Sequence, residues 1–150
     1  MGIAASPTRR RAPVGVAVRW LIGLESFVAV TAVAGGVLLM ARPDGSLLDA
    51  RISDLGSSSF ADWLVPGAFL LVLVGGGFTL TALTSRWAPA WFPTLSVLAG
   101  FGLIVFEITE TLWIRPQPLQ LLFGLVGAVV VVLALRSPTK PTEPAPVRRG

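Results

Sequence analysis

The sequence predicts an all-α fold: a bundle of four transmembrane helices with a short amphipathic helix in the first external loop. Three observations lead to this prediction. The 150-residue chain is 53% hydrophobic and only 13% charged, with a mean hydropathy of +0.77, which is too apolar for a soluble domain of this size. Long apolar segments recur four times along it. Charged residues and tryptophans gather near the ends of those segments.

Each apolar segment is close to the about 20 residues that an α-helix needs to cross about 30 Å of hydrocarbon. We place the four spans at about residues 14–40, 64–85, 93–114 and 118–135, with an external loop at 41–63.

The spans form one membrane domain, residues 14–135, with a tail on either side. Residues 1–13 make a basic N-terminal tail. Residues 136–150 are rich in proline and polar side chains and cannot bury an apolar face, so we expect them to be disordered.

The basic residues indicate how the chain is oriented. Under the positive-inside rule one arrangement makes nearly all of them cytoplasmic, with both termini and both tails inside the cell and the protein in the cell membrane. These residues are Arg9, Arg10, Arg11, Arg19, Arg86, Arg136, Lys140, Arg148 and Arg149. The net charge of +4 is explained in this way and does not indicate nucleic-acid binding.

The tryptophans fit the same layout, because all five lie at predicted span ends. Amphipathic indole rings favour the headgroup level of a bilayer. We therefore predict that they are interface anchors: Trp20, Trp63, Trp87, Trp91 and Trp113.

The first external loop contains a helical pattern. Leu48, Ile52 and Leu55 follow i, i+4, i+7 spacing with charged residues between them, and Gly56 can end the helix. We predict a short amphipathic helix on the outer membrane surface. An irregular loop whose leucines enter the interface stays open as an alternative.

Small residues spaced four apart occur in every span, and close backbone approach drives helix association in a bilayer. They predict a tightly packed bundle. The pairs are Ala32 and Gly36, Gly77 and Thr81, Ser96 and Gly100, and Gly124 and Ala128.

Two carboxylates stand near the end of the third span. At 1.5 Å per residue, Glu107 lies about 12 Å and Glu110 about 7 to 8 Å inside Arg115. Glu107 must face the bundle or a wet cavity, because an ionised carboxylate in lipid costs several kcal/mol. Glu110 can instead reach the outer interface or pair with Arg115.

The start of the fourth span is expected to place polar groups beside these glutamates. Pro118 suits the first helical position, and the helix N-terminus, flanked by two glutamines, favours nearby negative charge. We predict an outer polar pocket made of Glu107, Glu110, Thr111, Arg115, Gln117 and Gln120.

Glu25 in the first span is a separate intramembrane acid, about 9 Å inside Arg19 and on the cytoplasmic half. One interpretation is an internally hydrogen-bonded residue helped by Ser26. The other is the inner station of a proton or cation path whose outer station is Glu107.

Two motifs, FADWLVPG at residues 60–67 and QPLQLLFGL at residues 117–125, resemble an uncharacterised family of small four-span integral membrane proteins of bacteria, actinobacteria in particular. The likeness extends from Trp20 to Leu135. It implies the four-span fold and a shared outer-side site that includes the position of Glu107. It implies no activity.

The residue inventory limits the chemistry. Cys and His are both absent from the sequence, which excludes thiol nucleophiles, zinc-thiolate sites and the usual haem ligation, so we expect no metal and no cofactor. Glu107 and Glu110 would be the acid/base candidates of an enzyme, but no evident nucleophile accompanies them, and we assign no catalytic residue.

Three functions follow in order. The first is an accessory protein, or a binder of a lipid or small amphiphile, that uses the outer polar pocket. The second is a small proton- or cation-coupled transporter, oligomeric because four short helices enclose little cavity. The third is a membrane enzyme acting on a lipid. Besides the lipid bilayer, the expected partners are another membrane protein or further copies of the chain.

Overall fold

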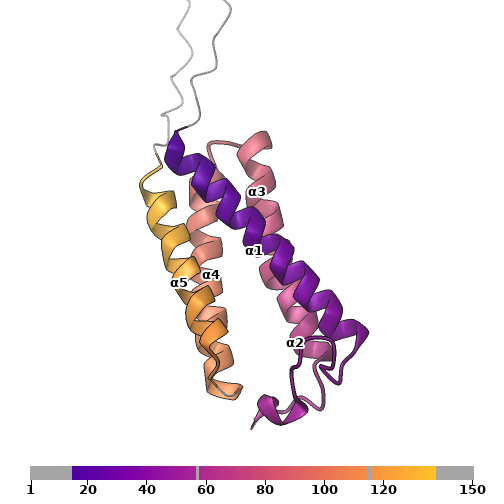
Figure 1. Ribbon diagram of the computed structural model, residues 1–150. Helices are drawn as coiled ribbons and strands as arrows, with labels where there is room; N and C mark the ends of the chain where they lie inside the picture. The colour runs from indigo at the N-terminus through magenta and orange to yellow at the C-terminus, as the bar shows by residue number, and fades with distance from the viewer. Residues whose placement is uncertain (1–14, 57, 115, 138–150) are drawn as a thin grey trace, which may run out of the picture.

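The computed structural model describes residues 15–56, 58–114 and 116–137, and within these ranges the protein is helical with no strands (Figure 1). Four helical spans are long and apolar enough to cross a membrane, as the sequence predicts. The first is α1, Val16–Ala41; the third is α4, Phe92–Trp113; and the fourth is α5, Pro118–Leu135. Their ends lie within about two residues of the predicted spans, the usual scatter of helix boundaries.

The second span is built from three helical pieces. It begins with α2, Leu64–Phe69, continues as a π-helix, η2, Leu70–Gly76, and ends with α3, Gly77–Trp87. A π-helical stretch of this kind is wider than an α-helix and often marks a functional region.

The spans associate as two pairs through glycine contacts. In the first pair, α1 lies on the second span, and a Cβ added to Gly36 would lie 2.7 Å from the carbonyl oxygen of Gly67. In the second pair, α4 lies on α5, and a Cβ added to Gly100 would lie 2.8 Å from the carbonyl oxygen of Gly127. Only glycine allows backbones to approach this closely.

The predicted small-residue faces are used in part. Gly36 and Gly100 lie in the helix contacts, whereas a Cβ added to Gly77 or Gly124 would meet nothing within 4 Å. In α5 the contact belongs to Gly127, because that residue and not Gly124 faces α4.

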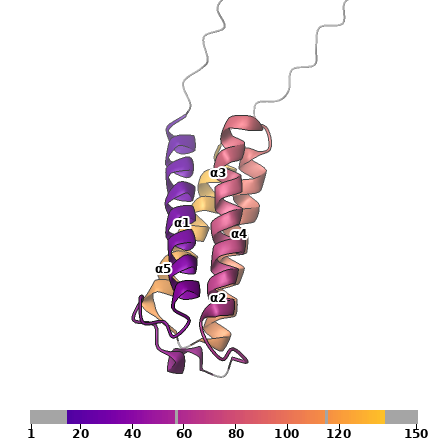
Figure 2. The same cartoon turned by 90° about the vertical axis from the view of Figure 1, so that its right-hand side faces the viewer.

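The two ends of the bundle differ. We call the end with the loop of residues 42–63 the loop end and the opposite one the terminal end. The two helix pairs converge at the terminal end and diverge toward the loop end (Figure 1). Figure 2, turned by 90°, shows the loop lying below the bundle, opposite the terminal end. The main core lies where they converge and includes side chains of all four spans, among them Leu21, Val28, Phe78, Phe92 and Val130.

The loop of residues 42–63 contains less helix than its sequence pattern predicts. Its helix is a single 3-10 turn, η1, Ile52–Leu55, because the chain already turns at Gly45 and Asp49, both of which have positive φ. A Cβ on Gly45 would collide with the carbonyl of Ala50. Leu55 is buried beneath the loop, whereas Leu48 and Ile52 are 44% and 50% exposed.

Candidate functional site

A groove of about 650 Å³ lies between the second span and α4. On one side it is lined by α2, η2 and α3, with Phe69, Leu73 and Phe78 among the side chains. On the other side α4 contributes apolar side chains from Leu95 to Phe106. The volume falls in the range of about 300 to 1,000 Å³ typical of small-molecule sites.

The groove exists partly because two glycines line it. Gly77 belongs to the second span and Gly102 to α4, and a Cβ added to either would meet no atom within 4 Å. Each glycine therefore leaves open space beside the groove that a larger side chain is expected to enter.

Glu110 is the only charged side chain among the described residues that line the groove. The lining has two other polar side chains, Thr81 and Thr109, and both hydroxyls donate to carbonyls of their own helix, at 2.9 Å to Gly77 and 2.8 Å to Val105. The groove is therefore apolar along its length and carries one ionisable group near the loop end.

Two aromatic rings lie near the same end. Phe60, from the loop of residues 42–63, and Phe69, from α2, both line the groove, with ring centroids 6.5 Å apart in an edge-to-face arrangement. Such a geometry is favourable for aromatic pairs. The part of the groove near the loop end thus combines aromatic rings with the carboxyl group of Glu110.

Three residues of the predicted polar pocket lie together. The carboxyl groups of Glu107 and Glu110 are close enough to interact electrostatically, and the side chain of Gln120 lies against that of Glu110. Glu107 is buried, with 8% of its surface exposed, whereas Glu110 and Gln120 are half-buried.

The N-terminus of α5 orients Gln120. Its Oε1 accepts a hydrogen bond from the backbone N–H of Gln117 at 3.0 Å, a capping arrangement that satisfies one of the free donors of the helix start. With its oxygen engaged in this way, Gln120 has its amide N–H groups left to face Glu110.

The other predicted pocket residues lie at its margin. Gln117 and Thr111 are exposed, and the hydroxyl of Thr111 donates to the carbonyl of Glu107 at 2.7 Å within α4. Arg115 lies outside the described residues.

Glu25 lies apart from this cluster, in the core of the terminal half. Its side chain is fully buried, and within the described part of the chain neither carboxyl oxygen has a hydrogen-bond partner. Ser96 of α4 is its polar neighbour, but the Ser96 hydroxyl donates to the carbonyl of Phe92 at 2.9 Å. Ser26, the expected helper, is exposed on the other face of α1.

The tryptophans take two kinds of position. Trp20, Trp87 and Trp91 are 66–76% exposed and lie near the terminal end, and their role as interface anchors stays a prediction. Trp63 is buried at the loop end against Leu39, Leu55 and Ile114, and its indole N–H has no hydrogen-bond partner among the described residues. The side chain of Trp113 lies outside the described residues.

The groove is the part of the site that the sequence does not predict. Phe60, Gly77 and Gly102 line it, yet the sequence offers no signal that distinguishes them from ordinary packing residues. Within the described ranges no group of three or more acidic residues could hold a metal ion.

Comparisons with protein-family models, curated proteins and solved structures gave no significant match.

Proposed function

We propose that this membrane protein binds the apolar chain of a lipid or small amphiphile in the groove between the second span and α4. The observation that carries the proposal is the groove itself, about 650 Å³ in volume and almost wholly apolar, with Glu110 near its loop end. Such a groove receives a chain directly from the bilayer, while the polar group of the ligand stays near the headgroup level.

The position of Glu110 supports this orientation of the ligand. Glu110 stands near the end of the apolar stretch Phe92–Leu112, within about 3 Å of it at 1.5 Å per residue. A ligand headgroup at the interface would therefore meet the carboxyl group while its chain lies along α4.

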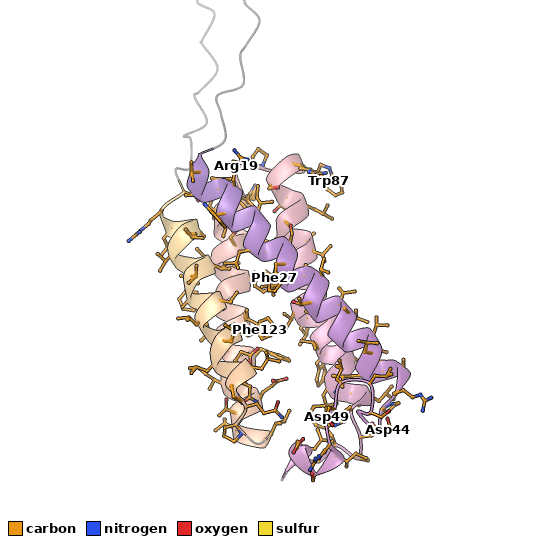
Figure 3. All side chains as sticks on the ribbon, in the orientation of Figure 1. Arg19, Phe27, Asp44, Asp49, Trp87 and Phe123 are labelled. Carbon is orange, nitrogen blue, oxygen red and sulfur yellow. The ribbon has the colours of Figure 1, made fainter. Side chains whose placement is uncertain are left out.

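We further propose that the protein resides in the cell membrane with both termini in the cytoplasm. Figure 3 shows Arg19 near the terminal end and Asp44 and Asp49 at the loop end. Arg86 in the last turn of α3 and Arg136 at the end of α5 also belong to the terminal end, whereas the loop of residues 42–63 carries four aspartates against two arginines. The positive-inside rule then makes the loop end the outer one.

The groove can be tested by filling it. Gly102→Leu adds a side chain into the groove, and Gly124→Leu is the matched control, because Gly124 also has open space around it but does not line the groove. Native mass spectra of protein gently extracted from its own membrane should show a retained lipid or amphiphile on the wild type and on Gly124→Leu, and its loss from Gly102→Leu. The same companions on all three forms, or none on the wild type, would count against the proposal.

A proton- or cation-coupled transporter is the second candidate, favoured by one observation. The carboxyl group of Glu25 is fully buried without a hydrogen-bond partner among the described residues, and intramembrane acids of this kind often belong to ion pathways. Proteoliposomes test it: a pH-dependent proton flux that Glu25→Gln and Glu107→Gln each abolish would establish a carrier.

A further inference from the structure

The residues that line the groove also indicate which headgroup its ligand has. This inference rests on the proposed function. The α4 side of the groove runs from Leu95 to Glu110, about 22 Å at 1.5 Å per residue. That length is most of the about 30 Å of hydrocarbon in a bilayer. An extended chain along the groove therefore brings the polar end of its molecule to Glu110.

The polar groups at that end favour a particular partner. The hydroxyl protons of Thr81 and Thr109 are engaged by their own helices, so neither is free to donate to a ligand. Glu110 offers carboxyl oxygens, which accept hydrogen bonds and attract positive charge. An acceptor of this kind complements a donor that is also a cation.

The surroundings of Glu110 strengthen this preference. A second carboxyl group, that of Glu107, lies close enough on α4 to interact with it electrostatically, and two ionised carboxylates there would repel each other. A cation between the groove and this pair would relieve that repulsion.

The aromatic rings add a further attraction. Phe60 and Phe69 line the groove near the end where Glu110 stands. Aromatic faces attract ammonium groups, and aromatic rings combined with a carboxylate are a common way to bind alkylated amines.

We infer that the groove selects amphiphiles with an ammonium headgroup, whose nitrogen lies at Glu110 beside Phe60 and Phe69 while the apolar chain follows α4 toward Leu95. The ligand is one molecule that fills both parts of the site. Neutral or anionic amphiphiles with the same chain lack the group that Glu110 attracts.

The test uses three probes with one chain and different headgroups: hexadecylammonium, hexadecanol and hexadecanoate. Their dissociation constants are measured by native mass spectrometry on the full-length protein in nanodiscs of a neutral phospholipid. We expect hexadecylammonium to bind the wild type about tenfold more tightly than hexadecanol, the size of effect that one partly buried charge pair gives. Hexadecanoate should bind most weakly.

Two variants separate the headgroup from the chain. Glu110→Gln should abolish the preference for hexadecylammonium and leave hexadecanol binding unchanged, which also shows that the variant is folded. Asp49→Asn is the matched control: it removes one negative charge at the same loop end, away from the groove, and the positive φ of 52° at this position suits asparagine. It should keep the preference.

The possible results are distinct. Equal binding of hexadecylammonium and hexadecanol to the wild type, both lost in Gly102→Leu, would overturn the ammonium inference and leave the chain-binding groove in place. A preference that survives Glu110→Gln, or tightest binding of hexadecanoate, would also overturn it. If Gly102→Leu binds all three probes as the wild type does, the proposed groove function itself fails.

Discussion

Gly100 and Gly127 lie against each other where α4 crosses α5. A Cβ on Gly100 would lie 2.8 Å from the carbonyl oxygen of Gly127, and a Cβ on Gly127 would lie 2.9 Å from that of Gly100. Each residue therefore has a backbone neighbour that cannot rotate away as a side chain can. This contact holds α4, which lines one side of the groove, against α5.

Enlarging either glycine should weaken the bundle. Gly127→Ala forces the two helices apart, and we expect a loss of about 1 to 3 kcal/mol in the free energy of unfolding, the usual effect of overpacking. The measurement is reversible unfolding in mixed micelles followed by circular dichroism.

Gly124→Ala is the control for this contact, since it lies in the same helix and its added Cβ would meet nothing within 4 Å. It should leave stability unchanged or raise it by up to about 1 kcal/mol through helix propensity. Equal stability of the two variants would mean that the helices do not touch at Gly127.

Replacing the buried Glu25 with an apolar residue should stabilise the protein. Glu25→Leu replaces a polar group that has no hydrogen-bond partner among the described residues with an apolar one of similar size. We expect the free energy of unfolding to rise by about 1 to 3 kcal/mol, because an unsatisfied buried polar group is removed.

Ser26→Leu, at the exposed neighbouring position, should change stability by no more than about 0.5 kcal/mol. Strong destabilisation by Glu25→Leu, measured in the same micelles, would reveal that the carboxyl group has a stabilising partner.

Much of this architecture follows from local properties of the sequence. The lengths and positions of the spans are set by the thickness of the bilayer, and the start of α5 is set by Pro118. The proximity of Glu107 to Glu110 follows from helical spacing alone, because residues three apart share one face.

The groove could not be predicted in this way, because it depends on how the two helix pairs diverge. Which glycines meet across spans is also hidden in the sequence: Gly124 and Gly127 look equivalent there, yet only Gly127 faces α4. The burial of Trp63 could not be predicted either. A tryptophan at a span end is expected to be an interface anchor, and only the structure shows that Trp63 packs against Leu55 of the loop.

Asp44, in the loop of residues 42–63, should make a pH-dependent contribution to stability. The backbone N–H and the hydroxyl of Ser46 both donate to its Oδ1, at 3.1 and 2.8 Å, and these bonds lower the pKa of Asp44 below its ordinary value of 3.8. A carboxyl group with a lowered pKa in the folded state stabilises the loop above its ordinary pKa. That contribution is lost as the pH falls through the lowered value.

Ser46→Ala removes one of these bonds and should raise the pKa of Asp44 toward the ordinary value. The side-chain carboxyl carbon of Asp44, followed by NMR through an acid titration, reports the change. Ser53→Ala is the control, because Ser53 is exposed in the same loop and takes no part in these bonds, so it should leave the midpoint of Asp44 where it is in the wild type. An unchanged midpoint in Ser46→Ala would show that the hydroxyl of Ser46 does not hold the carboxylate.

Single cysteines can test the proposed orientation against a clean background, because the natural chain has none. Ser53 is exposed in the loop, and Ala90 is exposed in the turn between α3 and α4 at the other end of the bundle. With the loop end outside, Ser53→Cys should react with a membrane-impermeant maleimide in intact cells, whereas Ala90→Cys should react only after the cells are opened. The reverse labelling pattern would show that the protein has the opposite orientation in the membrane. Glu107, Glu110 and the loop end of the groove would then lie on the cytoplasmic side. An amphiphile would have to enter the groove from the inner leaflet of the membrane.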